Sequence, residues 1–192
     1  SSAASDVYKR QDIERKRLTN NYKDGLELLY ERGKENPFFV GIPFIWCSNN
    51  YITAAVSQCK LYRELTGDKR YAEMEASLRD WLFGCNPWGT SMIVGLPKNG
   101  DFPVYPHSSL HKLNGYQTNG GLVDGPVYGS IFNNLIGLVL EREDPYAEFQ
   151  SNHFVYHDDV GDYSTNEPTM DGTASLVYYL SSLEKESIKY GH

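Results

Sequence analysis

The sequence lacks an excess of basic residues. It contains 18 Lys and Arg against 25 Asp and Glu among 192 residues, and its formal net charge at pH 7 is −7. Proteins that bind nucleic acids through phosphates need clustered Lys and Arg. The basic residues between positions 9 and 17 are diluted by Asp12 and Glu14, which favours a solvated helix face. We therefore expect no nucleic-acid partner.

Long apolar runs are also absent. No stretch approaches the roughly 18 apolar residues of a membrane span, so we expect no membrane partner. The first residues show no charged-then-apolar signal segment, which indicates that a leader was removed or that the chain does not start at a natural beginning. Residues 1–11 are expected to be disordered or left over from cloning, and residues 12–192 to form one domain.

Cysteines are few. Cys47, Cys59 and Cys85 are an odd number, so a fully paired disulfide framework is excluded, and no Cys/His cluster predicts zinc. Cys59 falls on an apolar helical stripe and is expected to be a small buried side chain. No feature predicts a cofactor.

The sequence does contain helical periodicity. Apolar spacings of three and four residues predict helices at about 12–33, 50–66, 71–85, 131–139 and 171–184, with no convincing strand. Gly33, Gly67 and Asn86-Pro87 are expected to end the first three. The predicted class is therefore all-α.

Two long connections interrupt these helices. Residues 88–128 are rich in glycine and proline, and residues 142–170 are rich in acids and aromatics. Loops longer than about 15 residues are usually functional. Helices joined by alternately short and long connections are typical of an α-hairpin toroid with its functional loops on one face, and five helices would be about half of such a double ring.

Aromatic residues make up 14% of the chain, with 15 Tyr, 8 Phe and 3 Trp. Tyr and Trp combine an apolar face with a polar group. Two interpretations stay open: a tyrosine-rich helical core, or a surface that stacks against sugar rings.

The second long loop carries four acids within residues 158–167. Cleavage of a glycosidic bond needs a proton donor and an opposing carboxylate, and a Glu near other acids suits the donor. Glu167 is the candidate. The alternative is that Asp158, Asp159 and Asp162 solubilise the loop or bind calcium. The spacing excludes an EF-hand but leaves another structural calcium site open.

The pattern of this loop resembles the second signature of glycoside hydrolase family 9, a group dominated by cellulases. Tyr156, Asp158, Tyr163 and Glu167 fill its defined positions, and Asp171 follows in register. Upstream, residues 82–95 are similar to the family's LG-x-NP-x-G-x-S-x-VxG run. Pro106-His107 resembles its Pro-His pair, and residues 120–126 resemble its GALVGGP segment.

The resemblance covers roughly residues 40–184. It implies that residues 12–192 are the C-terminal portion of an (α/α)6 toroid, about half of the barrel. The implied reaction is an inverting hydrolysis of β-linked glycans, and the implied location is periplasmic or extracellular.

The resemblance also implies roles for individual residues. Glu167 would be the general acid. His107 would hydrogen-bond the sugar next to the scissile bond, and Tyr163 would line the same subsite. The further expected substrate contacts are Asp158, Asp162 and Trp88, and no metal ligand is expected.

The sequence departs from the family where two arginines are expected, at Ser109 and Val160, and where an asparagine is expected, at Thr173. An Asp-rich motif that would supply the catalytic base is absent. We therefore expect that hydrolysis requires a missing N-terminal half of the same protein, that this chain alone is inactive, and that short sugars or an exposed chain end suit the site at least as well as cellulose. A non-catalytic carbohydrate-binding toroid is the main alternative, and a sugar lyase or isomerase is a weaker one.

Overall fold

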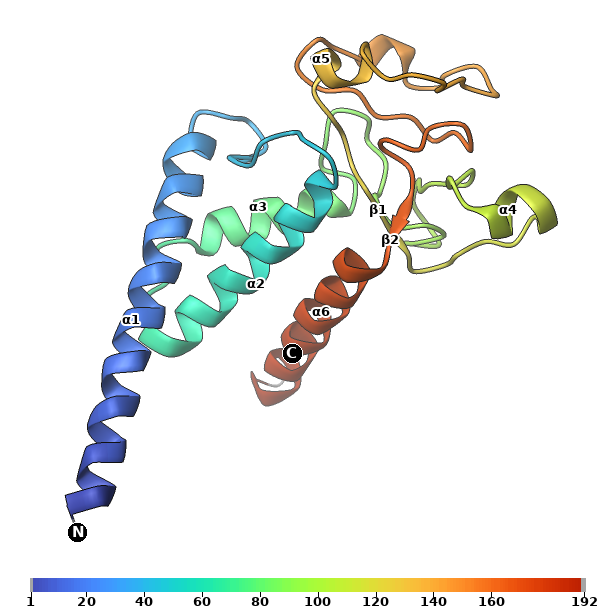
Figure 1. Cartoon of the computed structure of the whole chain (residues 1–192). Helices are drawn as coiled ribbons and strands as arrows, with labels where there is room; N and C mark the ends of the chain where they lie inside the picture. Colours follow the sequence, from blue (N-terminus) through green and yellow to red (C-terminus); the bar gives the residue numbers. More distant parts are fainter. Residues whose placement is uncertain (1, 191–192) are drawn as a thin grey trace.

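The computed structural model describes residues 2–190, which form a group of long helices and a loop-rich part beside it (Figure 1). The α-helices are α1 (Ser2–Gly33), α2 (Ser48–Thr66), α3 (Ala72–Leu82), α4 (Ser109–Asn114), α5 (Gly129–Phe132) and α6 (Met170–Tyr190). A 3-10 turn, η1, spans Ala147–Phe149. Two short strands, β1 (Leu122–Val123) and β2 (Pro168–Thr169), pair antiparallel. The prediction of a helical chain with long loops is confirmed.

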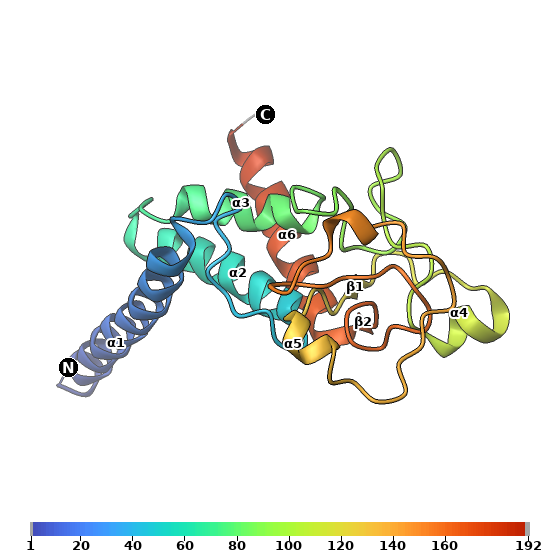
Figure 2. The same ribbon diagram turned by 90° about the horizontal axis from the view of Figure 1, so that it is seen from above.

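Helix α2 lies at the centre, because it packs against α1, α3 and α6. Its apolar stripe, which includes Ile52, Val56 and Cys59, is buried in one core with Trp81 of α3 and Leu176 of α6. Viewed from above, α3 and α6 lie beside α2, while α1 projects away from the loop-rich part (Figure 2). This is the helix packing of a partial (α/α)6 toroid.

The end of α2 follows directly from its sequence. Gly67 adopts a left-handed φ of 76°, and its N–H donates to the carbonyl of Arg63. Glycine reaches this conformation without a Cβ penalty, so the predicted stop at Gly67 is confirmed. Helix α3 ends at Leu82, earlier than Asn86-Pro87, and the amides of Phe83 and Cys85 both bond the carbonyl of Asp80.

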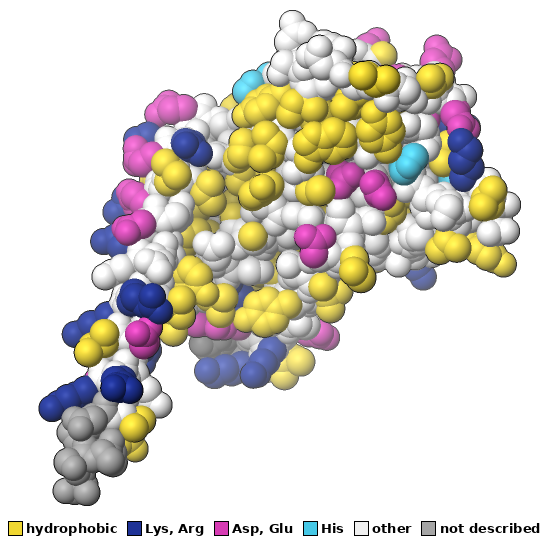
Figure 3. All heavy atoms as spheres, viewed as in Figure 1, with side chains coloured by type: hydrophobic (Ala, Val, Ile, Leu, Met, Phe, Trp, Pro, Cys, Tyr) yellow, Lys and Arg dark blue, Asp and Glu magenta, His cyan; other side chains and the backbone are white. Residues whose placement is uncertain are grey.

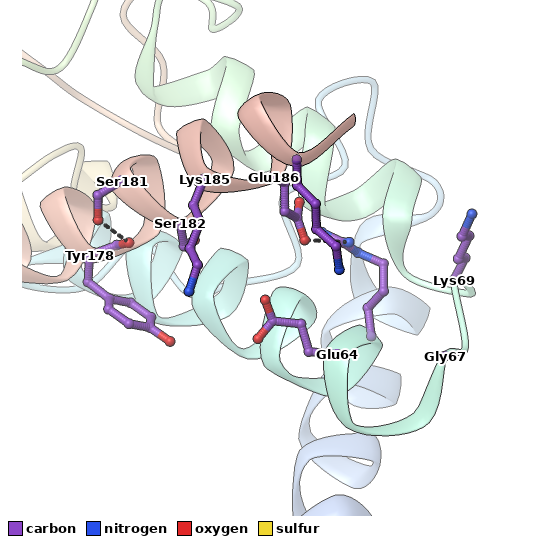
Figure 4. Close-up of a pocket in the computed structure, with 10 residues that line it drawn as sticks. Glu64, Gly67, Lys69, Tyr178, Ser181, Ser182, Lys185 and Glu186 are labelled. Atoms are coloured by element: carbon purple, nitrogen blue, oxygen red, sulfur yellow. Dashed lines mark hydrogen bonds and ion pairs between the residues drawn. The ribbon is translucent and has the colours of Figure 1, made fainter. Parts of the chain in front are cut away.

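A buried ammonium group links α2 to α6. Lys60 is 1% exposed, and its Nζ lies 2.8 Å from Glu64 and 2.7 Å from Glu186. Arg63 lies within ion-pair distance of Glu186 and of Glu75 on α3. Figure 4 shows the pocket of about 730 Å³ that these ends of α2 and α6 border. Because the two lining acids, Glu64 and Glu186, pair with Lys60 and Arg63 of α2, we assign this pocket a structural role.

Helix α1 begins at Ser2, ten residues before the predicted start near Asp12. The segment 2–11 contains neither glycine nor proline, so nothing in it interrupts helical geometry. Its apolar residues, such as Val7 and Tyr8, are exposed, which is why periodicity did not identify it. Residues 2–11 therefore form the first part of α1, and the expectation that residues 1–11 are disordered or left over from cloning stays a prediction.

The predicted helix at 131–139 is wrong. Helix α5 ends at Phe132, Gly137 turns the chain with φ 78°, and the side chains of Ile136 and Val139 are 92% and 71% exposed. The Phe132 ring contacts His157, but no apolar side chain of this run is itself buried within the described residues. The run is held as a loop by polar contacts instead, since the backbone oxygen of Ile136 accepts a bond from the Tyr163 hydroxyl.

The described helices contain no segment that is long and apolar enough to cross a membrane. Cys47, Cys59 and Cys85 are all free thiols, and Cys59 is buried as expected.

Candidate active site

Glu167 stands where the second long loop enters β2, three residues before α6 begins. Its backbone oxygen accepts a 2.9 Å hydrogen bond from the amide of Asp124, and the Thr165 oxygen accepts one from Gly125. These bonds extend the β1–β2 pairing into the loop. The position of Glu167 is therefore set by a short strand pair anchored to the first long loop.

Asp158 fixes the two long loops to each other. Its carboxylate accepts hydrogen bonds from the amides of Val104 (2.8 Å) and Tyr105 (2.9 Å) and from Nδ2 of Asn166 (3.2 Å). Burial raises the pKa of the Asp158 carboxyl, and these donors oppose that rise. The Asp158 carboxylate is buried and bonds groups of both loops. We therefore assign it a structural role, which is to hold the two loops together.

His107 is brought beside Glu167 by the same junction. Its amide donates to the backbone oxygen of Asn166 (2.9 Å), and its Nδ1 lies 2.6 Å from the oxygen of Val160. A pocket of about 390 Å³ opens there, and its lining residues are His107, Ser108, Ser109, Thr118, Glu167 and Pro168. Glu167 is the one carboxylate among these lining residues.

Tyr163 and Trp46 form an aromatic pair next to His107. Their rings are nearly parallel, at 12° with centroids 6.2 Å apart, and the His107 ring lies 6.2 Å from that of Tyr163. Trp46 is 43% exposed. Figure 3 shows a broad apolar area on this side of the loop-rich part, with Asp or Glu and His side chains beside it. Such a surface suits the apolar face of a sugar ring.

Asp162 is a fully buried hub within the acidic loop. Its carboxylate accepts bonds from His157 Nδ1 (2.8 Å) and from the backbone and hydroxyl groups of Ser164 and Thr165. Burial acts to raise the pKa of Asp162, but the hydrogen bonds from His157, Ser164 and Thr165 and the electrostatic influence of His157 outweigh it and lower the pKa below its ordinary value. Asp162 therefore holds the turn that precedes Glu167.

Trp88 lies in the core, not at the pocket. It is 4% exposed, packs edge-on against Trp81 and Phe154, and directs Nε1 toward Gln150. Many tyrosines are buried in the same way, including Tyr156 and Tyr179. Some of these aromatics therefore form part of the core, whereas others, such as Trp46, are exposed.

The structure brings together three of the six residues expected at the site: Glu167, His107 and Tyr163. The other three, Asp158, Asp162 and Trp88, are buried beneath the loops. Sequence reasoning missed Trp46 and Asp124. Trp46 could have been found as an aromatic two residues before the polar start of α2. Asp124 could have been found as an acid at the fifth position of the GALVGGP-like run, where the family segment has glycine.

Within residues 2–190, no group of three or more His, Cys, Asp or Glu side chains is arranged to hold a metal ion. The carboxylates of Asp158, Asp159 and Asp162 instead accept backbone amides. Asp159, for example, accepts those of Glu141, Arg142 and Gly161.

Replacing Asp162 with Asn should lower the free energy of unfolding at pH 7 by about 3 kcal/mol, because charge-assisted bonds in the buried turn are lost. The folded-state pKa of Asp162 is depressed, so its contribution is present above the ordinary Asp pKa of about 3.9 and is lost as the pH falls through the folded value. Urea unfolding of both proteins between pH 7 and pH 3 measures this.

The difference in the free energy of unfolding between wild type and Asp162→Asn should therefore become smaller below about pH 4. The exposed Glu148 provides the matched control, since Glu148→Gln should leave the unfolding curve unchanged. If wild type and Asp162→Asn differ in free energy of unfolding by the same amount at pH 3 and at pH 7, the role of this carboxylate is contradicted.

The two tryptophans should respond oppositely to truncation. Trp88→Ala should lower the free energy of unfolding by about 3–5 kcal/mol, because it empties a buried aromatic site. Trp46→Ala should change it by less than about 1 kcal/mol, because the side chain is half exposed. Chemical unfolding followed by far-UV circular dichroism measures both. Equal losses would show that the contrast in burial is wrong.

Comparison with known proteins identifies a family and solved structures that this chain resembles. The family model described as glycosyl hydrolase family 9 matches residues 5–180. A metagenome-derived family 9 endoglucanase structure shares 25% identity with a TM-score of 0.66 over 85% of this chain and 28% of its own. No curated protein sequence matches the chain significantly.

Two further structures show the same fold. AaCel9A, in complex with cellobiose-like isofagomine, is 23% identical with a TM-score of 0.64 and aligns over 88% of this chain and 30% of its own. A Bacteroides ovatus family 9 protein is 20% identical with a TM-score of 0.66, over 86% and 27%.

The chain thus spans less than a third of the length of these structures. The family model nevertheless matches nearly all of it, and the matched region includes both long loops and the strand pair between them. This chain belongs to glycosyl hydrolase family 9.

Proposed function

We propose that this chain supplies the acid-bearing wall of the cleft in an inverting glycoside hydrolase that acts on β-linked glucans, with Glu167 as the general acid. The observation that carries the proposal is the pocket in which the Glu167 carboxyl faces solvent beside His107. A general acid must reach the leaving oxygen of a bound substrate, and Glu167 is the carboxylate of this pocket that a substrate can reach.

The surroundings of Glu167 suit a sugar. Hydroxyl-bearing side chains of Ser108, Ser109 and Thr118 line the pocket, and they can bond the hydroxyls of a pyranose ring. The Trp46–Tyr163 pair offers an apolar face at the side of His107. Polar groups for orientation next to an aromatic surface are the usual composition of a small-molecule site.

The opposing carboxylate of an inverting pair lies about 6.5–9.5 Å from the acid, and the lining of this pocket contains no second acid. We propose that the remaining helices of the toroid supply it and cover the exposed apolar residues, such as Ile136 and Ile188. This chain by itself would then be inactive. A periplasmic or extracellular location belongs to the same proposal.

A second candidate is a carbohydrate-binding toroid without hydrolysis. Ser109 and Val160 stand where the family signature has arginines. The Val160 residue contributes only its backbone oxygen, which lies within hydrogen-bond distance of His107 Nδ1. Loss of two always-charged donors weakens catalytic substrate positioning. Binding of cello-oligosaccharides without product, in a protein extended to the length of its relatives, would favour this candidate.

Glu167→Gln in that extended protein should reduce kcat on cello-oligosaccharides by about 10²–10⁴-fold, because the amide donates no proton. Substrate affinity should change little, since the side chain keeps its shape. Turnover is measured by product chromatography and affinity by calorimetry. Proton NMR of the first product should show inverted anomeric configuration.

Glu148→Gln, an exposed acid on η1, is the matched control and should retain full activity. Normal turnover in Glu167→Gln would remove Glu167 from the acid role. Retained configuration in the product would contradict the inverting mechanism.

A further inference from the structure

Asp124 and Glu167 face each other across the strand pair. The register pairs Leu122 with Thr169 and Val123 with Pro168, and the bond from the Asp124 amide to the Glu167 oxygen continues that register by one residue. Directly opposed residues of an antiparallel pair project to the same face, with Cβ atoms about 4.5–5.5 Å apart. The backbone thus places the Cβ atoms of Asp124 and Glu167 next to each other.

The two carboxyls differ in exposure. Asp124 is 3% exposed, whereas Glu167 is exposed and lines the pocket. Within the described residues, neither side chain forms an ion pair with Lys or Arg. Like charges that lie directly opposite each other destabilise a strand pair, so simultaneous ionisation of both carboxyls is disfavoured.

The groups around Asp124 strengthen this effect. The titratable neighbours that act on it are Glu167, Asp162 and Asp171, together with the thiol of Cys47 at the start of α2. Burial, and then the charges of these acids, raise the pKa of Asp124 to about 7. The Cys47 thiol opposes the rise, because its hydrogen bond stabilises the Asp124 carboxylate.

We propose that Asp124 is a positioning residue for the acid chemistry of Glu167, and that it acts through the charge of a buried carboxyl that stands opposite Glu167 in the strand register. The assignment rests on the proposed role of Glu167. A negative charge on Asp124, which Cys47 stabilises by donating its S–H, favours the protonated form of a carboxyl that lies opposite it. When Glu167 protonates the glycosidic oxygen, the C–O bond breaks with its electron pair on that oxygen, a water bonds to the anomeric carbon, and the proton of that water goes to the base carboxylate proposed for the remaining helices.

Carboxyl ¹³C NMR titration of this chain tests the coupling without any hydrolysis. Glu167→Gln removes a neighbouring charge from an exposed position, so it should lower the titration midpoint of Asp124 by about one pH unit. In wild type, ionisation of Asp124 should appear as an inflection near pH 7 in the Glu167 resonance. That inflection should vanish in Asp124→Asn.

Glu148→Gln controls for removal of a remote charge and should leave the Asp124 midpoint in place. An Asp124 midpoint that is the same in wild type and Glu167→Gln would overturn the coupling, whether or not Glu167 proves to be the general acid. Since Glu167 is exposed, this variant keeps the fold and the result is readable even if Asp124→Asn unfolds.

In the extended protein, Asp124→Asn should lower kcat by about tenfold with KM unchanged, and should move the alkaline limb of kcat/KM to lower pH, because the charge that favours protonated Glu167 is lost. A purely structural role would not move that limb. An unchanged pH profile would therefore overturn the proposal, while loss of activity in Glu167→Gln tests the acid role separately.

Discussion

Three buried carboxylates hold the loop that carries Glu167. Asp158, Asp159 and Asp162 accept backbone amides that neither a helix nor a strand satisfies. A buried amide without a partner costs about as much as a lost hydrogen bond. Each carboxylate satisfies several, so a long irregular segment keeps a defined shape. The rest of the site depends on this constraint.

The same carboxylates join parts of the chain that are far apart in sequence. Asp158 holds the segment before His107, Asp159 holds the amides of Glu141 and Arg142, and Asp162 holds the turn before Glu167. The helices contribute differently: α2 anchors the core, and α6 begins directly after β2. Function is thus placed on loops by a packed helical base.

The sequence predicts the helical part well, since α2, α3 and α6 bury apolar stripes and Gly67 ends α2 as expected. The run at 131–139 is just as apolar, but Gly137 and the bond to the Ile136 oxygen hold it as an exposed loop. Periodicity reports which residues are apolar. It does not report whether a partner surface exists for them in this chain.

The site shows the same division. The acidic motif identifies Tyr163 and Glu167, and the Pro-His pair of the first long loop identifies His107. The fold brings these three residues together. The burial of Asp158, Asp162 and Trp88, and the pairing of Asp124 with Glu167, depend on contacts between the two loops. No local pattern encodes those contacts.

Amide hydrogen exchange tests the central claim most directly, that carboxylates rather than regular secondary structure hold the site. The amides of Val104, Tyr105, Ser164 and Thr165 bond Asp158 or Asp162. Their exchange should be slower than that of an unstructured peptide by roughly a hundredfold or more, although they lie in loops. Exchange of these amides at the unstructured rate, in a chain whose α2 amides are protected, would contradict the account.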